Sequence, residues 1–79
     1  MDQPQKLTKA VLVKVVEQEG YLVLKASTLP DESVTVSIRN WTDPEPPRAG
    51  TDVVLEGLVH HRGGWRANHA RYLQPEDLL

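Results

Sequence analysis

Alternating apolar and polar residues predict two short strands in the first half of the chain. The alternation is regular over segments 21–26 and 33–41, so each segment presents one apolar face and one polar face. We expect the apolar faces to turn inward and the polar faces, with Tyr21 and Arg39, to turn to water. The inward positions are Leu22, Leu24 and Ala26 in the first segment, and Val34, Val36 and Ile38 in the second.

Three further extended segments are predicted on either side of these two. Segment 7–17 carries β-branched residues on both faces, as expected of a long strand that bends and serves two parts of a barrel. Segment 52–61 reads as a strand in which Gly57 marks a bulge or bend. Residues 62–64 predict a tight hairpin leading into the last strand, segment 65–73.

The segments between the strands have turn chemistry rather than helical periodicity. Turns are expected at 19–20 and over 27–33, which contain glycine in the first case and Pro30-Asp31 in the second. The stretch 42–50 holds three prolines within four residues, which excludes a helix interior or a central strand there.

Five strands joined by short turns predict one small all-β domain. We expect a five-stranded barrel of the oligonucleotide/oligosaccharide-binding (OB) kind, because closure removes the strand edges that so short a chain cannot otherwise cover. An SH3-like barrel is the alternative. The barrel is assigned to 7–73, a flexible N-terminus to 1–6, and a tail with one helical turn to 74–79.

Composition and charge exclude some classes of protein but do not identify a function. The chain of 79 residues has no cysteine and a formal charge of −2, which argues against a generally basic nucleic-acid coat protein. No apolar run approaches the roughly 20 residues that span a bilayer, and the first residues do not resemble a signal peptide. We therefore expect a cytoplasmic protein without a membrane segment.

The second half of the chain resembles the cold-shock domain family. Residues 48–59 look like that family's glycine- and valine-marked lead into strand four, and 62–70 look like its glycine hairpin followed by Ala-Asn. The resemblance spans about residues 7–73. It implies an OB barrel that binds single-stranded nucleic acid through outward aromatic residues.

The family's aromatic motifs are largely missing from this chain. Cold-shock domains carry K-G-F-G-F-I on strand two and V-F-V-H-F on strand three. Tyr21 is the one aromatic retained in the corresponding segments, and Val23, Thr35 and Ser37 stand where the others are expected. Each stacked base contributes about 1–3 kcal/mol, so we expect weaker single-strand binding than the family's.

Basic side chains and one aromatic share the predicted outward face of the first three strands. With hydroxyl residues between them, they suit a phosphate backbone laid across the sheet. An ordinary solvated barrel face has the same composition. The residues are Lys14, Tyr21, Lys25 and Arg39.

A second basic stretch lies near the C-terminus. Residues 60–72 contain three arginines, three histidines and no acid, which reads either as an anion-facing patch or as a solvated hairpin. Trp65 could stack on a base or cap the open end of the barrel. Trp41, just before the proline-rich stretch, is expected chiefly to pack against the prolines. Arg62 and Arg66 extend the basic track if the hairpin folds alongside.

Metal and catalytic chemistry find no support in the pattern. His60 and His61 are adjacent, so on a strand they point to opposite faces, and no third ligand lies at a familiar spacing. No serine has a signalled histidine partner, and the paired glycines form a hairpin rather than a phosphate-binding loop. We expect a protein that is not an enzyme and uses no metal or cofactor.

Two binding functions remain. The first is a module for single-stranded DNA or RNA that makes mostly backbone contacts. The second is a protein-interaction barrel acting as a small subunit or adaptor, using the barrel face or the terminal Leu78 and Leu79. The residues expected to bind nucleic acid are Lys14, Tyr21, Lys25, Arg39, Arg62, Trp65 and Arg66.

Overall fold

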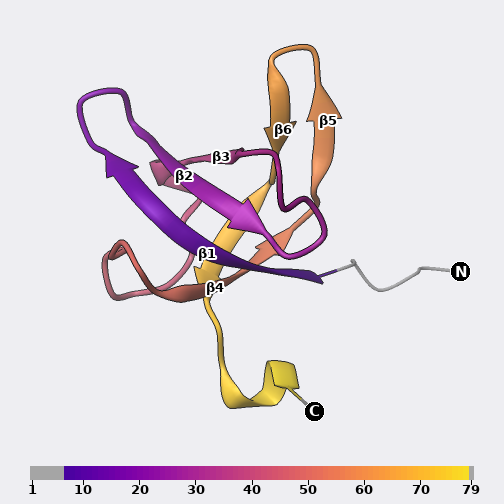
Figure 1. The fold of residues 1–79 in the computed structure, drawn as a ribbon. Coiled ribbons are helices and arrows are strands. Elements are labelled where there is room, and N and C mark those ends of the chain that lie inside the picture. The colour runs from indigo at the N-terminus through magenta and orange to yellow at the C-terminus, as the bar shows by residue number, and fades with distance from the viewer. Residues whose placement is uncertain (1–6, 79) are drawn as a thin grey trace, which may run out of the picture.

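The structure, a computed structural model, describes residues 7–78 and shows one strongly curled sheet (Figure 1). Its strand order is β5-β6-β3-β2-β1-β4-β7, and every pair is antiparallel except β3 with β6. The all-β prediction is confirmed. The strands are β1 (Leu7–Val16), β2 (Tyr21–Ala26), β3 (Val34–Ser37), β4 (Asp52–Glu56), β5 (Val59–His61), β6 (Gly64–Arg66) and β7 (His69–Tyr72).

The number of strands differs from prediction, with seven in place of five. Each of the last two expected strands is interrupted once, after Glu56 in the first and after Arg66 in the second. The first interruption falls at Gly57, which has φ +72° and so leaves the extended conformation. The bend predicted at this glycine is therefore confirmed, although it ends a strand rather than curving it.

The alternation of inward and outward residues changes phase at both interruptions. Before Gly57 the β4 residues of the core cluster are the odd-numbered Val53 and Leu55, whereas after it the even-numbered Leu58 packs against the core. At the second interruption Ala67, between β6 and β7, and Ala70, on β7, are both buried. They are three residues apart, which a regular strand does not allow, so Asn68 inserts an extra position into the alternation.

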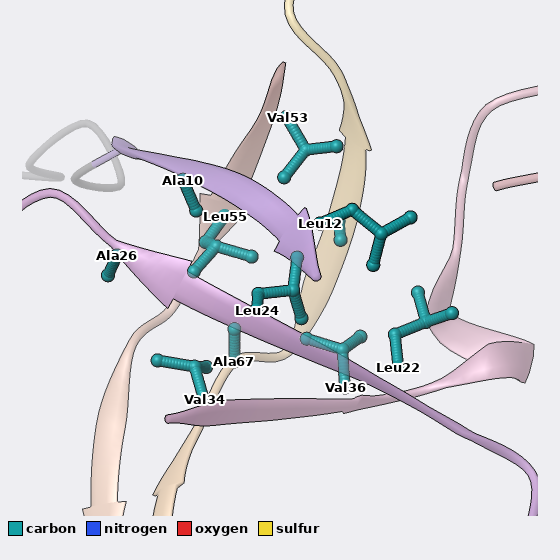
Figure 2. Packing of buried hydrophobic residues seen from close by; sticks show 11 residues of the cluster. Ala10, Leu12, Leu22, Leu24, Ala26, Val34, Val36, Val53, Leu55 and Ala67 are labelled. Carbon is teal, nitrogen blue, oxygen red and sulfur yellow. The ribbon is translucent and has the colours of Figure 1, made fainter. Parts of the chain in front are cut away.

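The core lies inside the curl and is built from small and medium aliphatic side chains (Figure 2). Both alternating faces predicted from the sequence supply it: Leu22, Leu24 and Val34 are fully buried, and Val36 is nearly so. The long first strand adds Leu12 and bends at an irregularity between Leu12 and Lys14, as expected of a strand that serves two parts of the sheet.

Strand β3 is shorter than predicted. The extended segment expected over 33–41 ends at Ser37, and Ile38–Asn40 form a single 3-10 turn, η1. The backbone N–H of Trp41 donates to the carbonyl of Ile38 at 3.0 Å and closes this turn. Arg39 is exposed, as predicted, but it projects from η1 rather than from the strand.

Two aromatic residues hold the proline-rich stretch against the sheet. The rings of Trp41 and Tyr72 meet edge to face at 4.8 Å. The Trp41 indole N–H donates to the carbonyl of Glu45 at 2.7 Å, and the Tyr72 hydroxyl donates to the carbonyl of Pro46. The predicted packing of Trp41 against this stretch takes the form of these contacts to the loop.

The C-terminal segment forms one 3-10 turn, η2 (Pro75–Leu78), in keeping with the single helical turn expected there. The flexible N-terminus assigned to 1–6, and the terminal Leu79, lie outside the described residues. Within residues 7–78, no helix has the length and apolar character needed to cross a membrane.

Candidate ligand groove

A groove of about 540 Å³ opens on the outward side of the sheet, between β3 and the β5–β6 hairpin. Figure 1 shows this hairpin projecting from the curled sheet beside β3. The groove draws on segments far apart in the sequence: the turn before β2, strands β2 and β3, η1, the hairpin, and the interruption between β6 and β7. The side chains that matter most are Glu19, Tyr21, Thr35, Ser37, Asn40, His61, Arg66 and Asn68.

Strand register explains why these side chains meet. Tyr21 on β2 pairs directly with Ser37 on β3, so both side chains lie on the same face. Thr35 pairs with Arg66 across the parallel contact between β3 and β6. The neighbouring positions Val34 and Val36 are buried, which fixes Thr35 and Ser37 as outward-facing.

The same register places Lys14 in line with the groove. Lys14 pairs with Val23 on β2, Val23 pairs with Thr35 on β3, and Thr35 pairs with Arg66 on β6. This row crosses four strands on the outward face, with a cation at each end. Lys14 is exposed and lies outside the groove lining, so it extends the basic track rather than forming the groove.

Of the seven residues predicted to bind nucleic acid, Tyr21 and Arg66 line the groove. Arg39 and Arg62 are exposed and lie next in sequence to the lining residues Asn40 and Gly63, at two ends of the site. Lys25 pairs with Val11, on the outer side of the sheet but away from the lining.

Trp65 is placed differently from the other six. It pairs with buried Val34, packs against the core, and lies 4.9 Å from the ring of His60. Its indole N–H donates to a carboxylate oxygen of Glu32 at 2.8 Å, which links the hairpin to the β2–β3 turn. Of the two alternatives for Trp65, this geometry matches packing rather than base stacking.

Several groove residues were not among the seven predicted to bind, and Asn40, His61 and Asn68 are three of them. Asn40 was assigned to a strand that in fact ends in η1, and Asn68 lies at an interruption that shifts the alternation. His61 was considered as a metal ligand and as part of the basic stretch 60–72, but not singled out as a binding residue. The phase change after Gly57 was the available signal, because it places His61 on the outward face, opposite to His60.

The third arginine of the basic stretch is engaged elsewhere. Arg71 forms a two-pronged ion pair with Asp77, with both nitrogen–oxygen distances 2.9 Å. The Asp77 carboxylate accepts these hydrogen bonds from Arg71 and one from the Gln74 backbone N–H at 2.7 Å, which together lower the pKa of Asp77 from 3.8 to about 2. Hydrogen bonding to Asp77 in turn raises the pKa of Arg71. This pair fastens η2 to β7, so Arg71 belongs to the fold rather than to the groove.

The groove is polar, with one aromatic ring, one permanent cation and one carboxylate, Glu19. Hydroxyl and amide groups from Thr35, Ser37, Asn40 and Asn68 supply both hydrogen-bond donors and acceptors. Across residues 7–78, no three histidine, aspartate or glutamate side chains gather closely enough to hold a metal ion. This chemistry suits recognition of a ligand with an aromatic part and an anionic part.

Comparison with known proteins gives no family for the chain. The resemblance to cold-shock domains therefore remains a prediction from the sequence. No protein-family model, no curated protein and no solved structure matches this chain.

Proposed function

We propose that the curled sheet is an OB-like barrel of five bent strands. In this description β4 and β5 form one strand, and β6 and β7 form another, each kinked where its pairing changes. Two backbone hydrogen bonds at the second kink support this description. The N–H of Ala67 donates to the carbonyl of Thr35 on β3 at 3.3 Å, and the N–H of Asn68 donates to the carbonyl of Glu56 on β4 at 2.8 Å. One continuous segment thus joins both ends of the sheet, an arrangement that favours the OB alternative over an SH3-like barrel.

We infer that the protein is a non-catalytic module that binds single-stranded DNA or RNA in this groove. The observation that carries the proposal is that Tyr21 and Arg66, far apart in sequence, line one groove whose floor carries Thr35 and Ser37. Single-strand binding needs an aromatic face for a base and cations for phosphates, and the groove supplies both. A cytoplasmic location is part of this proposal.

Two groove residues and the cations around the groove have different parts in the proposal. The Tyr21 ring stacks on one base, while Arg66 pairs with a phosphate. Cations outside the groove attract the phosphates on either side of the stacked base, an attraction that salt weakens. They are Lys14, Arg39, Lys25 and Arg62. With one stacking residue and few cations, the affinity is expected in the micromolar range at low salt, weaker than in proteins with several stacked bases.

The test is a fluorescence titration of labelled single strands of about 20 nucleotides at about 50 and 200 mM salt. The wild type is expected to bind, with affinity falling as salt rises. Arg66→Ala should weaken binding about tenfold and reduce the salt slope by about 1, and Tyr21→Ala should weaken binding about tenfold at unchanged slope. Absence of binding at about 50 mM salt with tens of micromolar protein would overturn the proposal.

Lys9→Ala is the matched control. Lys9 is an exposed cation on β1 that pairs with Val54, on a part of the sheet outside the groove. Its loss changes the net charge by the same amount as loss of Arg66. If Lys9→Ala and Arg66→Ala weaken binding equally, the attraction is a general charge effect and the groove is not the site.

A second candidate function, protein interaction, is favoured by apolar exposure on another surface. Leu7, Val11 and Val13 on β1 are 42–47% exposed, and Leu78 in η2 is 62% exposed. A partner with an apolar surface would cover such positions. Failure of the titration, together with capture of a partner that Val13→Asp abolishes, would support this second function. The terminal Leu79 lies outside the described residues.

A further inference from the structure

We propose that the groove contains a subsite that reads one nucleobase through the side-chain amide of Asn68. The inference rests on the proposed function and goes beyond it, because backbone and stacking contacts alone do not distinguish bases. The subsite lies where β6 and β7 are interrupted, at the side of the groove formed by Asn68 and its neighbour Ala67.

Two features hold the amide in place. Arg66 and Asn68, on either side of buried Ala67, both line the groove. The Asn68 amide also rests directly on Gly57, where even a Cβ would approach its Nδ2 to 2.4 Å. The backbone at Gly57 closes one side of the amide, so fewer side-chain rotamers are open to Asn68 and the amide is held toward the groove that it lines.

The amide is free to serve a ligand. Within residues 7–78, neither Asn68 nor Asn40 uses its side-chain amide in a hydrogen bond to the protein. An asparagine amide offers a carbonyl acceptor and an N–H donor side by side. It therefore matches a base edge that presents a donor beside an acceptor, whereas Arg66 offers only donors and suits phosphate.

The site has the size and the second contact that a base requires. Its volume of about 540 Å³ lies within the roughly 300–1,000 Å³ typical of small-ligand sites. Tyr21 lines the same groove and supplies the face on which the base stacks. Adenine is the expected base, because its N6 amine and N7 give the two-point pairing that asparagine makes with bases.

The experiment compares single-stranded homopolymers of the four bases, bound by the wild type and by two variants. The wild type is expected to bind the adenine strand about tenfold more tightly than the cytosine strand. Asn68→Leu, close in size but unable to hydrogen-bond, should remove this preference while keeping the salt slope. Arg66→Ala should weaken all four strands by the same factor and keep the preference.

A measurement on the unaltered protein guards against a misfolded variant. Replacing adenine by 7-deazaadenine removes the N7 acceptor only, and the wild type is expected to lose about fivefold or more in affinity. Equal binding of all four homopolymers with a normal salt slope would overturn this inference and leave the proposed function standing. If no homopolymer binds, the proposed function fails, and the base-reading subsite fails with it.

Discussion

Gly57 and Asn68 lie in contact across the point where the sheet changes its pairing, and a Cβ on Gly57 would come within 2.9 Å of Asn68 Cγ. Gly57 ends β4 and Asn68 precedes β7, so the two interruptions in the sheet face each other. One close contact therefore joins the kink of the fold to the side of the proposed site. The kink after Gly57 sets the outward direction of His61, whereas pairing with Thr35 sets that of Arg66.

Gly57→Ala is expected to destabilise the protein by about 2 kcal/mol, since it combines an unfavourable φ with the clash against Asn68. Urea unfolding followed by tryptophan fluorescence measures the change. Gly50→Ala is the matched control: Gly50 has φ +86° but open space around it, so only the conformational cost of about 1 kcal/mol applies. Equal losses for the two variants would show that the Asn68 contact carries no energy.

Trp65→Phe should separate stability from binding. The substitution keeps a ring against the core but removes the hydrogen bond to Glu32, so we expect a loss of about 1 kcal/mol in the free energy of unfolding. The oligonucleotide affinity of folded Trp65→Phe should stay within about twofold of wild type. Tyr21→Ala should instead lower the affinity, and should change the free energy of unfolding less than Trp65→Phe does. A large loss of affinity in folded Trp65→Phe would place Trp65 in the ligand site after all.

Tyr72 is expected to stabilise the proline-rich loop through both its ring and its hydroxyl. Tyr72→Phe removes the hydrogen bond to Pro46 and should cost about 1 kcal/mol, while Tyr72→Ala also removes the ring beside Trp41 and should cost about 3 kcal/mol. Urea unfolding curves give both values. If the two variants lost the same free energy, the edge-to-face contact would contribute nothing.

The docking of η2 should depend on pH through Asp77. An acid whose pKa is lowered by folding stabilises the fold above its unfolded value, here 3.8, and loses that effect as the pH falls through the folded value of about 2. The backbone N–H of Gln74 donates to this carboxylate, so the NMR chemical shift of that backbone amide should titrate with a midpoint near 2. A midpoint near 3.8 would mean that the ion pair with Arg71 does not form.

Two variants complete the acid titration. Asp77→Asn should abolish the titration of the Gln74 amide, because the titrating carboxylate is gone. Glu76→Gln, in the same turn, should leave it nearly unchanged, because Glu76 makes no side-chain hydrogen bond within residues 7–78. Loss of the titration in both variants would trace it to the general charge of the turn.

The parts of the fold that depend on local alternation could be predicted from the sequence. Leu22, Leu24, Val34 and Val36 are buried as expected, because a period of two fixes which side of a strand faces the core. The prolines excluded a long helix over 42–50 for an equally local reason. The end of β3 at Ser37 was missed, because Ile38 continues the apolar alternation although the backbone turns there.

The candidate site was harder to predict, because it depends on contacts between distant segments. Tyr21 could be identified as outward-facing, but its proximity to Arg66 depends on β3 pairing with β6, which no local pattern reports. His61 was missed because it follows the phase change at Gly57, and Asn68 because it lies at the interruption between β6 and β7. Gly57 signalled one of these changes, while nothing in the residues around Asn68 signalled the other.

NMR can locate a bound single strand on the protein directly, through titration of the ¹⁵N-labelled protein with an oligonucleotide. If the strand lies in the groove, the largest amide shifts fall on Tyr21, Thr35, Ser37, Arg66 and Asn68, and β1 residues Val11 and Val13 barely move. Shifts centred on Val11 and Val13, or spread evenly over the exposed cations, would contradict binding in the groove.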